Sequence, residues 1–256
     1  MLDEIEATAI EAVEIGADEL RNRFVDEISP AEYTAYDVKA EADQAAETVM
    51  LDVITQSFPD HRIYAEESGE HTGNSEYRWI VDPLDGTNNF TAGLPTFASA
   101  ATVLHNNEPV VAAVTIPPLN DLYTARVDNG MRYNDQEVMA TSDRPLTHGT
   151  TFFVIGHDVK RHVSRAEAAK KIQDSMADSC KRVIESWSPC VHWGLLARGL
   201  FDGVVTYYLD AEEQYAGELF AAESGVVSRS SGPLYIGALN DERLDELSAA
   251  IESPHL

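Results

Sequence analysis

The chain has 256 residues, with 44 Asp and Glu against 18 Lys and Arg, so its formal net charge is −26. This charge disfavours nucleic acids and anionic membranes as partners, because the electrostatic part of such binding would be repulsive. No apolar run approaches the roughly 18 residues of a membrane span, and the acidic start lacks the layout of a signal peptide. With only two cysteines, neither in a metal-binding spacing, the sequence predicts a cytoplasmic protein.

The acidic residues are spread along the chain instead of being gathered in a tail, which argues against a disordered acidic segment. Uniform acidity of this kind suits high intracellular salt, where screening shortens charge repulsion to a few Å. A halophilic archaeal source is therefore expected. The alternative is an acidic protein from an organism of ordinary salt.

The first half of the chain is expected to place two helices against an antiparallel sheet. Apolar spacing predicts helices over residues 3–24 and 40–57. Alternating or short apolar runs predict strands over residues 62–66, 78–82, 97–105, 110–116 and 122–127. Turns are expected at residues 106–107, 117–118 and 129–130.

The second half alternates between strand and helix patterns. The predicted strands cover residues 151–155, 181–184 and 203–208, and the predicted helices cover residues 165–176, 191–198 and 213–223. A last helix is expected to begin near Asn240, a suitable N-cap. Because Pro145, Thr147 and Gly149 cluster between the halves, we expect an N-terminal lobe of residues 1–146 and a C-terminal α/β lobe of residues 147–256.

The most informative segment is residues 79–90, where an apolar strand pattern runs into two carboxylates, Asp82 and Asp85. The two carboxylates and the Leu84 carbonyl are hard oxygen ligands of the kind Mg²⁺ prefers. Gly86 and Thr87 follow at the expected start of a helix, where backbone N–H groups favour an anion such as phosphate. The alternative for Asp85-Gly86 is a plain turn between strands.

Several segments in the same order resemble the inositol monophosphatase family of Mg²⁺-dependent, lithium-sensitive phosphomonoesterases, which includes archaeal fructose-1,6-bisphosphatases. Those segments are residues 38–43, 58–61 with 66–68, 79–90, 198–203 and 216–225. The resemblance implies an α/β (α+β) fold, the layered αβαβα sandwich of the sugar phosphatases in two lobes. It also implies a small phosphate ester as substrate, a homodimer and, with the acidity, a haloarchaeal member.

The resemblance implies a metal centre of two or three Mg²⁺ ions, with Mn²⁺ as a substitute. The first ion would take Glu66, Asp82 and the Leu84 carbonyl. The second would take Asp82, Asp85 and a carboxylate of the second lobe, for which Glu213 stands at the family's position. The alternative for Glu66 is a solvated residue at a strand end.

The resemblance also implies catalytic and substrate-binding roles. Thr87 would hold the nucleophilic water together with Glu66, and Asp43 would orient the Thr87 hydroxyl. Asp43 is the least distinct of these residues, because helices of this chain carry many carboxylates, such as Glu47, that are expected on the surface. Gly86, Thr87 and Ser186 would contact the phosphate and the sugar.

The sequence departs from the family pattern in the second lobe. Where the family has Trp-Asp-x-Ala-Ala-Gly, residues 212–217 read Glu-Glu-Gln-Tyr-Ala-Gly, so Glu213 replaces an Asp and reaches one methylene further. Asp210 is an alternative ligand. The segment at residues 29–33 lacks the family's Lys, and Thr206 stands where the family has a Glu that binds an inositol hydroxyl. The eight histidines show no zinc-ligand spacing and receive no role.

Two functions therefore remain open. The leading hypothesis is a Mg²⁺-dependent phosphomonoesterase acting on inositol monophosphate, fructose-1,6-bisphosphate or a related polyol phosphate by means of a metal-activated water. The alternative is a catalytically impaired family member that binds a phosphometabolite or serves as a structural protein.

Overall fold

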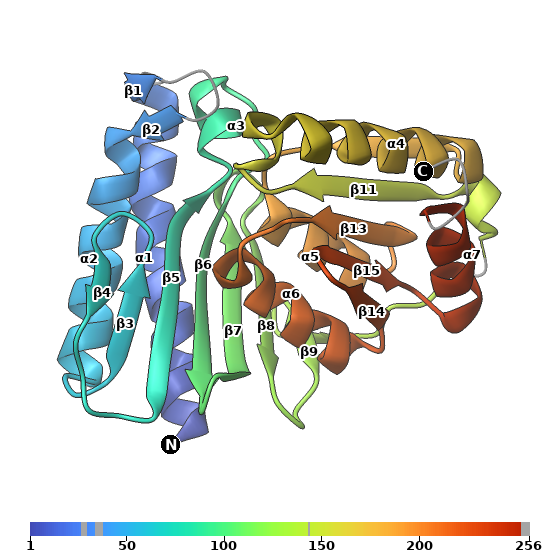
Figure 1. The fold of residues 1–256 in the computed structure, drawn as a ribbon. Helices are drawn as coiled ribbons and strands as arrows, with labels where there is room; N and C mark the ends of the chain where they lie inside the picture. Colours follow the sequence, from blue (N-terminus) through green and yellow to red (C-terminus); the bar gives the residue numbers. More distant parts are fainter. Residues whose placement is uncertain (27–29, 34–37, 143, 252–256) are drawn as a thin grey trace.

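The protein folds into five layers in the order helix, sheet, helix, sheet, helix (Figure 1). The computed structural model describes residues 1–26, 30–33, 38–142 and 144–251, and it describes no side chains within residues 25–40. The helices are α1 (Leu2–Asp26), α2 (Glu41–Ser57), α3 (Thr87–Thr91), α4 (Val163–Ser179), α5 (Pro189–Ala197), α6 (Ala211–Ser224) and α7 (Asp241–Ile251). Three short 3-10 helices lie at Pro117–Leu119, Leu146–His148 and Val159–Arg161.

The first large sheet has eight strands in the order β10-β9-β8-β7-β6-β5-β3-β4. Its strands are β3 (Arg62–Ala65), β4 (Gly69–His71), β5 (Tyr77–Asp85), β6 (Ala98–His105), β7 (Glu108–Ile116), β8 (Asp121–Arg126), β9 (Met131–Tyr133) and β10 (Gln136–Val138). The hairpin between β6 and β7 turns at Asn106 and Asn107, which adopt φ values of 54° and 69°, a left-handed conformation that Asn tolerates.

The second large sheet has five strands in the order β12-β11-β13-β15-β14. Its strands are β11 (Thr150–Ile155), β12 (Arg182–Glu185), β13 (Gly203–Tyr207), β14 (Val227–Ser231) and β15 (Leu234–Ala238). β11 runs parallel to β12 and β13, as expected for strands joined through helices, and β14 and β15 form an antiparallel hairpin at the edge. A separate small sheet pairs β1 (Pro30–Tyr33) with β2 (Val38–Ala40).

Three large apolar cores separate the layers. The first lies between the helix pair α1–α2 and the eight-stranded sheet, and the last lies between the five-stranded sheet and the pair α4–α7. The central core packs α5 and α6 between the two sheets and includes Trp193, Phe220, Tyr123 and Phe152. Because α5 and α6 contact both sheets, side chains at their ends can reach the edge of the first sheet.

The sequence predicted most of these elements, with some corrections. The first sheet is not wholly antiparallel, because β3 and β5 pair in parallel. Seven strands were missed: β1, β2, β4, β9, β10, β14 and β15. Asn240 is confirmed as the N-cap of α7, since its Oδ1 accepts a hydrogen bond from the Arg243 N–H at 3.0 Å. No helix within the described residues is long and apolar enough to cross a bilayer.

Candidate active site

The candidate site forms where β5 leaves the first sheet. The pairing of β5 with β6 shifts register between Asp82 and Asp85, so the strand continues to Asp85 with an irregularity instead of ending at Asp82. At this bend the Leu84 N–H donates to Asp82 Oδ1 at 3.1 Å. Gly86 follows with a φ of 94°, a backbone conformation that residues other than glycine rarely adopt. The motif of residues 79–90 thus turns both carboxylates out of the sheet.

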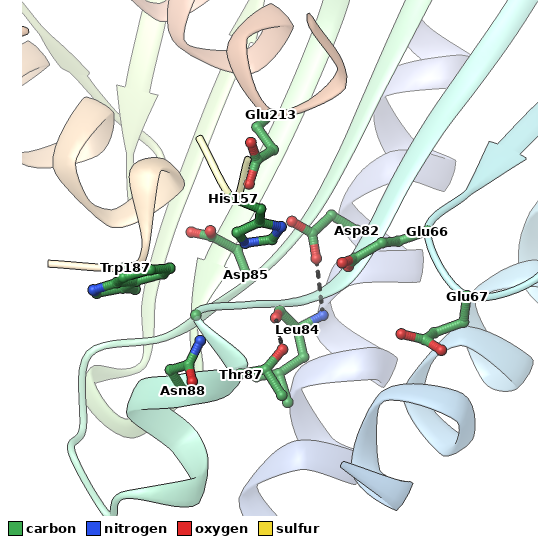
Figure 2. A pocket seen from close by; sticks show the side chains of 11 residues that line it. Glu66, Glu67, Asp82, Leu84, Asp85, Thr87, Asn88, His157, Trp187 and Glu213 are labelled. Carbon is green, nitrogen blue, oxygen red and sulfur yellow. Dashed lines mark hydrogen bonds between the residues drawn. The ribbon is translucent and has the colours of Figure 1, made fainter. Parts of the chain in front are cut away.

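The carboxylates face a cavity that draws its lining from both halves of the chain (Figure 2). Acidic side chains dominate the lining, and none of the lining residues whose side chains the structure describes is a Lys or Arg. Among the site residues predicted from the sequence, those that line it are Glu66, Asp82, Leu84, Asp85, Gly86, Thr87 and Glu213. Trp187, the residue after Ser186, also lines it, as do Glu67, Asn88 and His157, to which the sequence assigned no role.

Asp85 is held in place by the second half of the chain. Its buried Oδ2 accepts hydrogen bonds from the Ser188 hydroxyl at 2.6 Å and from the Cys190 N–H at 2.8 Å. Burial raises the pKa of Asp85 to about 8, although both hydrogen bonds favour the charged form. The carboxylate is therefore fixed by one oxygen, and Oδ1 is not engaged by these two donors.

The carboxylates raise one another's pKa values. Burial, then the charges of Glu66, Asp85 and Glu213, raise the pKa of Asp82 well above its ordinary value. Burial and the charges of Asp210 and Glu66 raise the pKa of Glu213 to about 8. A cluster of partly desolvated carboxylates is stabilised by protons or by bound cations.

The donor set therefore suits a hard cation, because the cavity offers carboxylate and carbonyl oxygens. Within the described part of the chain, however, no three Asp, Glu, His or Cys side chains are gathered closely enough to hold an ion. Since unneutralised carboxylates repel one another, we expect the side chains to draw together when a cation binds.

Glu213 is the second-half carboxylate that lines this cavity, and Asp210 is not among the residues around it. Glu213 occupies the N3 position of α6, where its side chain accepts from the Asp210 N–H at 3.4 Å in a capping box. Asp210 lines an adjoining cavity of about 330 Å³ together with Glu66, Asp82 and Glu213. The geometry thus favours Glu213 over Asp210 as the completing ligand.

Three other predicted residues have the following positions. The Thr87 hydroxyl donates to the Leu84 carbonyl at 3.2 Å. Asp43 is buried in the first turn of α2 and does not line the cavity. Ser186 also lies off the cavity lining, and its hydroxyl receives a hydrogen bond from Asn89 Nδ2 at 3.4 Å. The family's Lys is absent from residues 29–33. Of these, Ser29 lies outside the described residues, and residues 30–33 have no described side chains.

Glu47 was expected on the helix surface, and that expectation was wrong. It is 5% exposed, and its Oε2 accepts a hydrogen bond from the Glu67 N–H at 2.9 Å. A buried carboxylate usually has such a donor, because an unsatisfied one is costly. Glu47 therefore fixes the turn that carries Glu66 after β3.

This geometry agrees with what is found among known proteins. A family model described as the inositol monophosphatase family matches residues 1–238. The chain belongs to the inositol monophosphatase family. One relative is the Nus factor SuhB of Salmonella typhimurium, 30% identical over 89% of this chain and 90% of the relative. Another is the fructose-1,6-bisphosphatase/inositol-1-monophosphatase of Aquifex aeolicus, 30% identical over 72% of this chain and 69% of the relative.

Solved structures show the same fold. The extragenic suppressor protein suhB of Bartonella henselae superposes with a TM-score of 0.89 at 21% identity, covering 98% of this chain and 99% of that one. An inositol monophosphatase from Anabaena gives a TM-score of 0.84 at 23% identity, covering 100% and 98%. The predicted αβαβα fold of this inositol monophosphatase family member is thereby confirmed.

Proposed function

We propose that the protein is a Mg²⁺-dependent phosphomonoesterase that hydrolyses a small sugar or polyol phosphate. The observation that carries this proposal is the convergence of Asp82 and Asp85 from β5 with Glu213 from α6 on one cavity. Phosphate ester hydrolysis needs a positioned water and neutralised charge, and little covalent chemistry from the protein. The family membership and the Aquifex relative's name support the same activity.

The residues would share the work as follows. Glu66, Asp82 and the Leu84 carbonyl would hold one ion, and Asp82, Asp85 and Glu213 would hold another. Bound Mg²⁺, or Mn²⁺ in its place, supplies Lewis acidity that activates water and stabilises the leaving oxygen, and a third ion can share the site.

The other site residues would position water and substrate. Thr87 would hold the attacking water together with Glu66. For this role the Thr87 hydroxyl must turn away from the Leu84 carbonyl. Asp43 would support Thr87 from α2, and Gly86 and Ser186 would contact the ester.

The direct test is phosphate release from myo-inositol 1-phosphate, fructose-1,6-bisphosphate and glycerol 2-phosphate at molar KCl. We expect release with Mg²⁺ and Mn²⁺ and none with EDTA. Release that persists in EDTA, or no release from any ester, would contradict the proposal. A homodimer, a cytoplasmic location, a halophilic archaeal source and the absence of nucleic acid partners remain predictions from the sequence.

A second candidate is a binding role without turnover. It is favoured by Glu213, which stands in place of an Asp and reaches one methylene further. Relatives named as Nus factors, similar over most of the chain, add a regulatory role to this candidate. Mg²⁺-dependent binding of myo-inositol 1-phosphate without phosphate release would support it.

A further inference from the structure

Tyr208 has an unusual backbone conformation just after the end of β13. Its φ is 54°, in the left-handed region. The other non-glycine residues with positive φ in the described part of the chain are six Asn or Asp residues, whose short polar side chains can hydrogen-bond locally in this conformation. A bulky aromatic residue has no such compensation, so the surrounding structure must hold Tyr208 in place.

Tyr208 sets the direction of the chain between β13 and α6. The strand ends at Tyr207, and Asp210 is the N-cap of the helix. Because so few residues join the strand to the cap, the left-handed turn at Tyr208 determines the angle at which α6 leaves the sheet. Glu213 lies in the first turn of α6, and its side chain points from the helix toward the carboxylates of β5 (Figure 2). The conformation of Tyr208 therefore determines where Glu213 lies.

The backbone of Tyr208 is held from two sides. Its N–H donates to the Pro233 carbonyl at 2.8 Å, in the turn between β14 and β15. Its own carbonyl lies against Gly156, because a Cβ added to Gly156 would be 1.8 Å from that oxygen. The Gly156 N–H in turn donates to the Tyr207 carbonyl at 3.0 Å. Since Gly156 precedes His157, which lines the candidate active-site cavity, the turn at Tyr208 packs directly against the site.

The ring of Tyr208 is held as well, although the residue is 37% exposed. The guanidinium carbon of Arg165, from α4, lies 4.1 Å from the ring centroid, within cation–π range. The Tyr207 ring meets the Tyr208 ring edge to face, with centroids 4.8 Å apart. These contacts favour one orientation of the ring and offset part of the cost of the left-handed backbone.

We propose that Tyr208 is a positioning residue, whose left-handed turn places the Glu213 carboxylate where it can complete the metal site. The inference rests on the proposed function for the role of Glu213 as a Mg²⁺ ligand. Backbone strain that the surroundings maintain occurs at active sites, where it holds a functional group in one position. Tyr208 is not among the residues that line the candidate active-site cavity, so it acts through Glu213.

Calorimetric titration of Mg²⁺ into Tyr208→Gly tests this role. Glycine adopts the left-handed conformation without strain, but it does not restrict the turn and it removes the ring contacts. We expect the Mg²⁺ dissociation constant to rise about tenfold, while kcat at saturating Mg²⁺ stays within about twofold of the wild-type value. Tyr208→Phe keeps the ring and should bind Mg²⁺ as the wild type does. Asn120, a left-handed residue that does not line the cavity, provides the matched control Asn120→Gly, which should leave the constant unchanged.

A double substitution shows whether Tyr208 acts through Glu213. If it does, Tyr208→Gly should change the Mg²⁺ dissociation constant less than about twofold in a Glu213→Gln background, because the carboxylate that it positions is already gone. The inference is overturned by a full effect in that background, by an unchanged constant in Tyr208→Gly alone, or by equal weakening in Tyr208→Phe or Asn120→Gly.

Mg²⁺ binding also separates this inference from the proposed function. If the wild-type protein binds Mg²⁺ but releases phosphate from no ester, the phosphatase proposal fails, and the dissociation constants of the variants still measure the positioning role. If phosphate is released and Tyr208→Gly binds Mg²⁺ as tightly as the wild type, the positioning role alone fails. A wild-type protein that binds no Mg²⁺ overturns both.

Discussion

At the scale of single residues, the carboxylates of the cavity are arranged for a bound cation. Asp82 and Asp85 both have raised pKa values because they are desolvated beside other acids. Cation binding needs these side chains charged, whereas the metal-free fold is more stable when they are neutral.

Substituting either carboxylate with its amide should separate these demands. We expect Asp82→Asn and Asp85→Asn each to lower Mg²⁺-dependent turnover at least about 100-fold, because each removes a charged ligand. The fold should remain intact, since the substitution relieves repulsion among the remaining acids. Turnover and the metal-free thermal midpoint measure the two effects. Asp52→Asn, an exposed carboxylate on α2, is the matched control and should change neither; wild-type turnover in both site variants would refute the site.

Ser188 offers a second test at this scale. Ser188→Ala removes the 2.6 Å hydrogen bond that holds Asp85 Oδ2. Because that bond favours the ionised carboxylate, its loss should raise the pKa of Asp85 further and increase the Mg²⁺ concentration for half-maximal activity by about tenfold. A buried serine of α7, Ser248, provides the control variant Ser248→Ala. An unchanged Mg²⁺ requirement would mean that Asp85 needs no such support.

Protonation gives a third test. Asp85 and Glu213 titrate near pH 8 in the folded protein and near pH 4 when unfolded. Between these values the folded state holds more protons than the unfolded chain, so the stability of the metal-free protein should fall as pH rises from about 5 to 8. Thermal midpoints in EDTA at constant KCl measure this slope, and Asp85→Asn should reduce it. A midpoint in EDTA that rises over this range would contradict these pKa values.

At the scale of elements, the sequence predicted the features formed by residues close together in the chain. It missed those formed when distant segments pack together. The segment of residues 79–90 carries its carboxylates, glycine and turn in one stretch, so both their identity and their common position could be predicted. Ser188 and His157 could not, because only the packing of the second sheet and α5 brings them to β5. The strand β14 was missed because it is polar and largely exposed at a sheet edge, so it has no apolar alternation.

The N-terminus of α6 has two tasks, which predicts a graded mutational response. Glu213 belongs both to the capping box and to the cavity. Glu213→Gln keeps a capping oxygen but loses the charge, so it should raise the Mg²⁺ concentration for activity with little loss of stability. Glu213→Asp keeps the charge with a shorter reach and should change metal affinity modestly. Asp210→Ala should mainly destabilise, by about 1 kcal/mol, through the lost cap.

Metal titrations and thermal unfolding of these three α6 variants distinguish the two carboxylates. If Asp210→Ala raised the Mg²⁺ requirement more than Glu213→Gln, Asp210 would be the ligand. A Mn²⁺-soaked crystal should show the Glu213 carboxylate at the ion shared with Asp82 and Asp85.

At the scale of the whole molecule, the site depends on the five-layer architecture. The helices α5 and α6 share the central core with both sheets, and the residues at their N-termini are those that hold Asp85 and supply Glu213. Loss of packing between the sheets would therefore separate the two halves of the cavity. The chain also carries 44 acidic residues.

This acidity predicts a dependence of stability on salt. With a net charge of −26, the folded state holds like charges closer together than the unfolded chain does, so repulsion destabilises it. Molar KCl shortens the screening length to about 3 Å, and we expect the thermal midpoint to rise steeply between low salt and molar KCl. Adding Mg²⁺ at low salt should give only part of this rise, because it neutralises the cavity and not the surface. Asp82→Asn removes the Mg²⁺ response and should leave the KCl response intact. A thermal midpoint that does not change with KCl would identify an acidic protein without adaptation to salt.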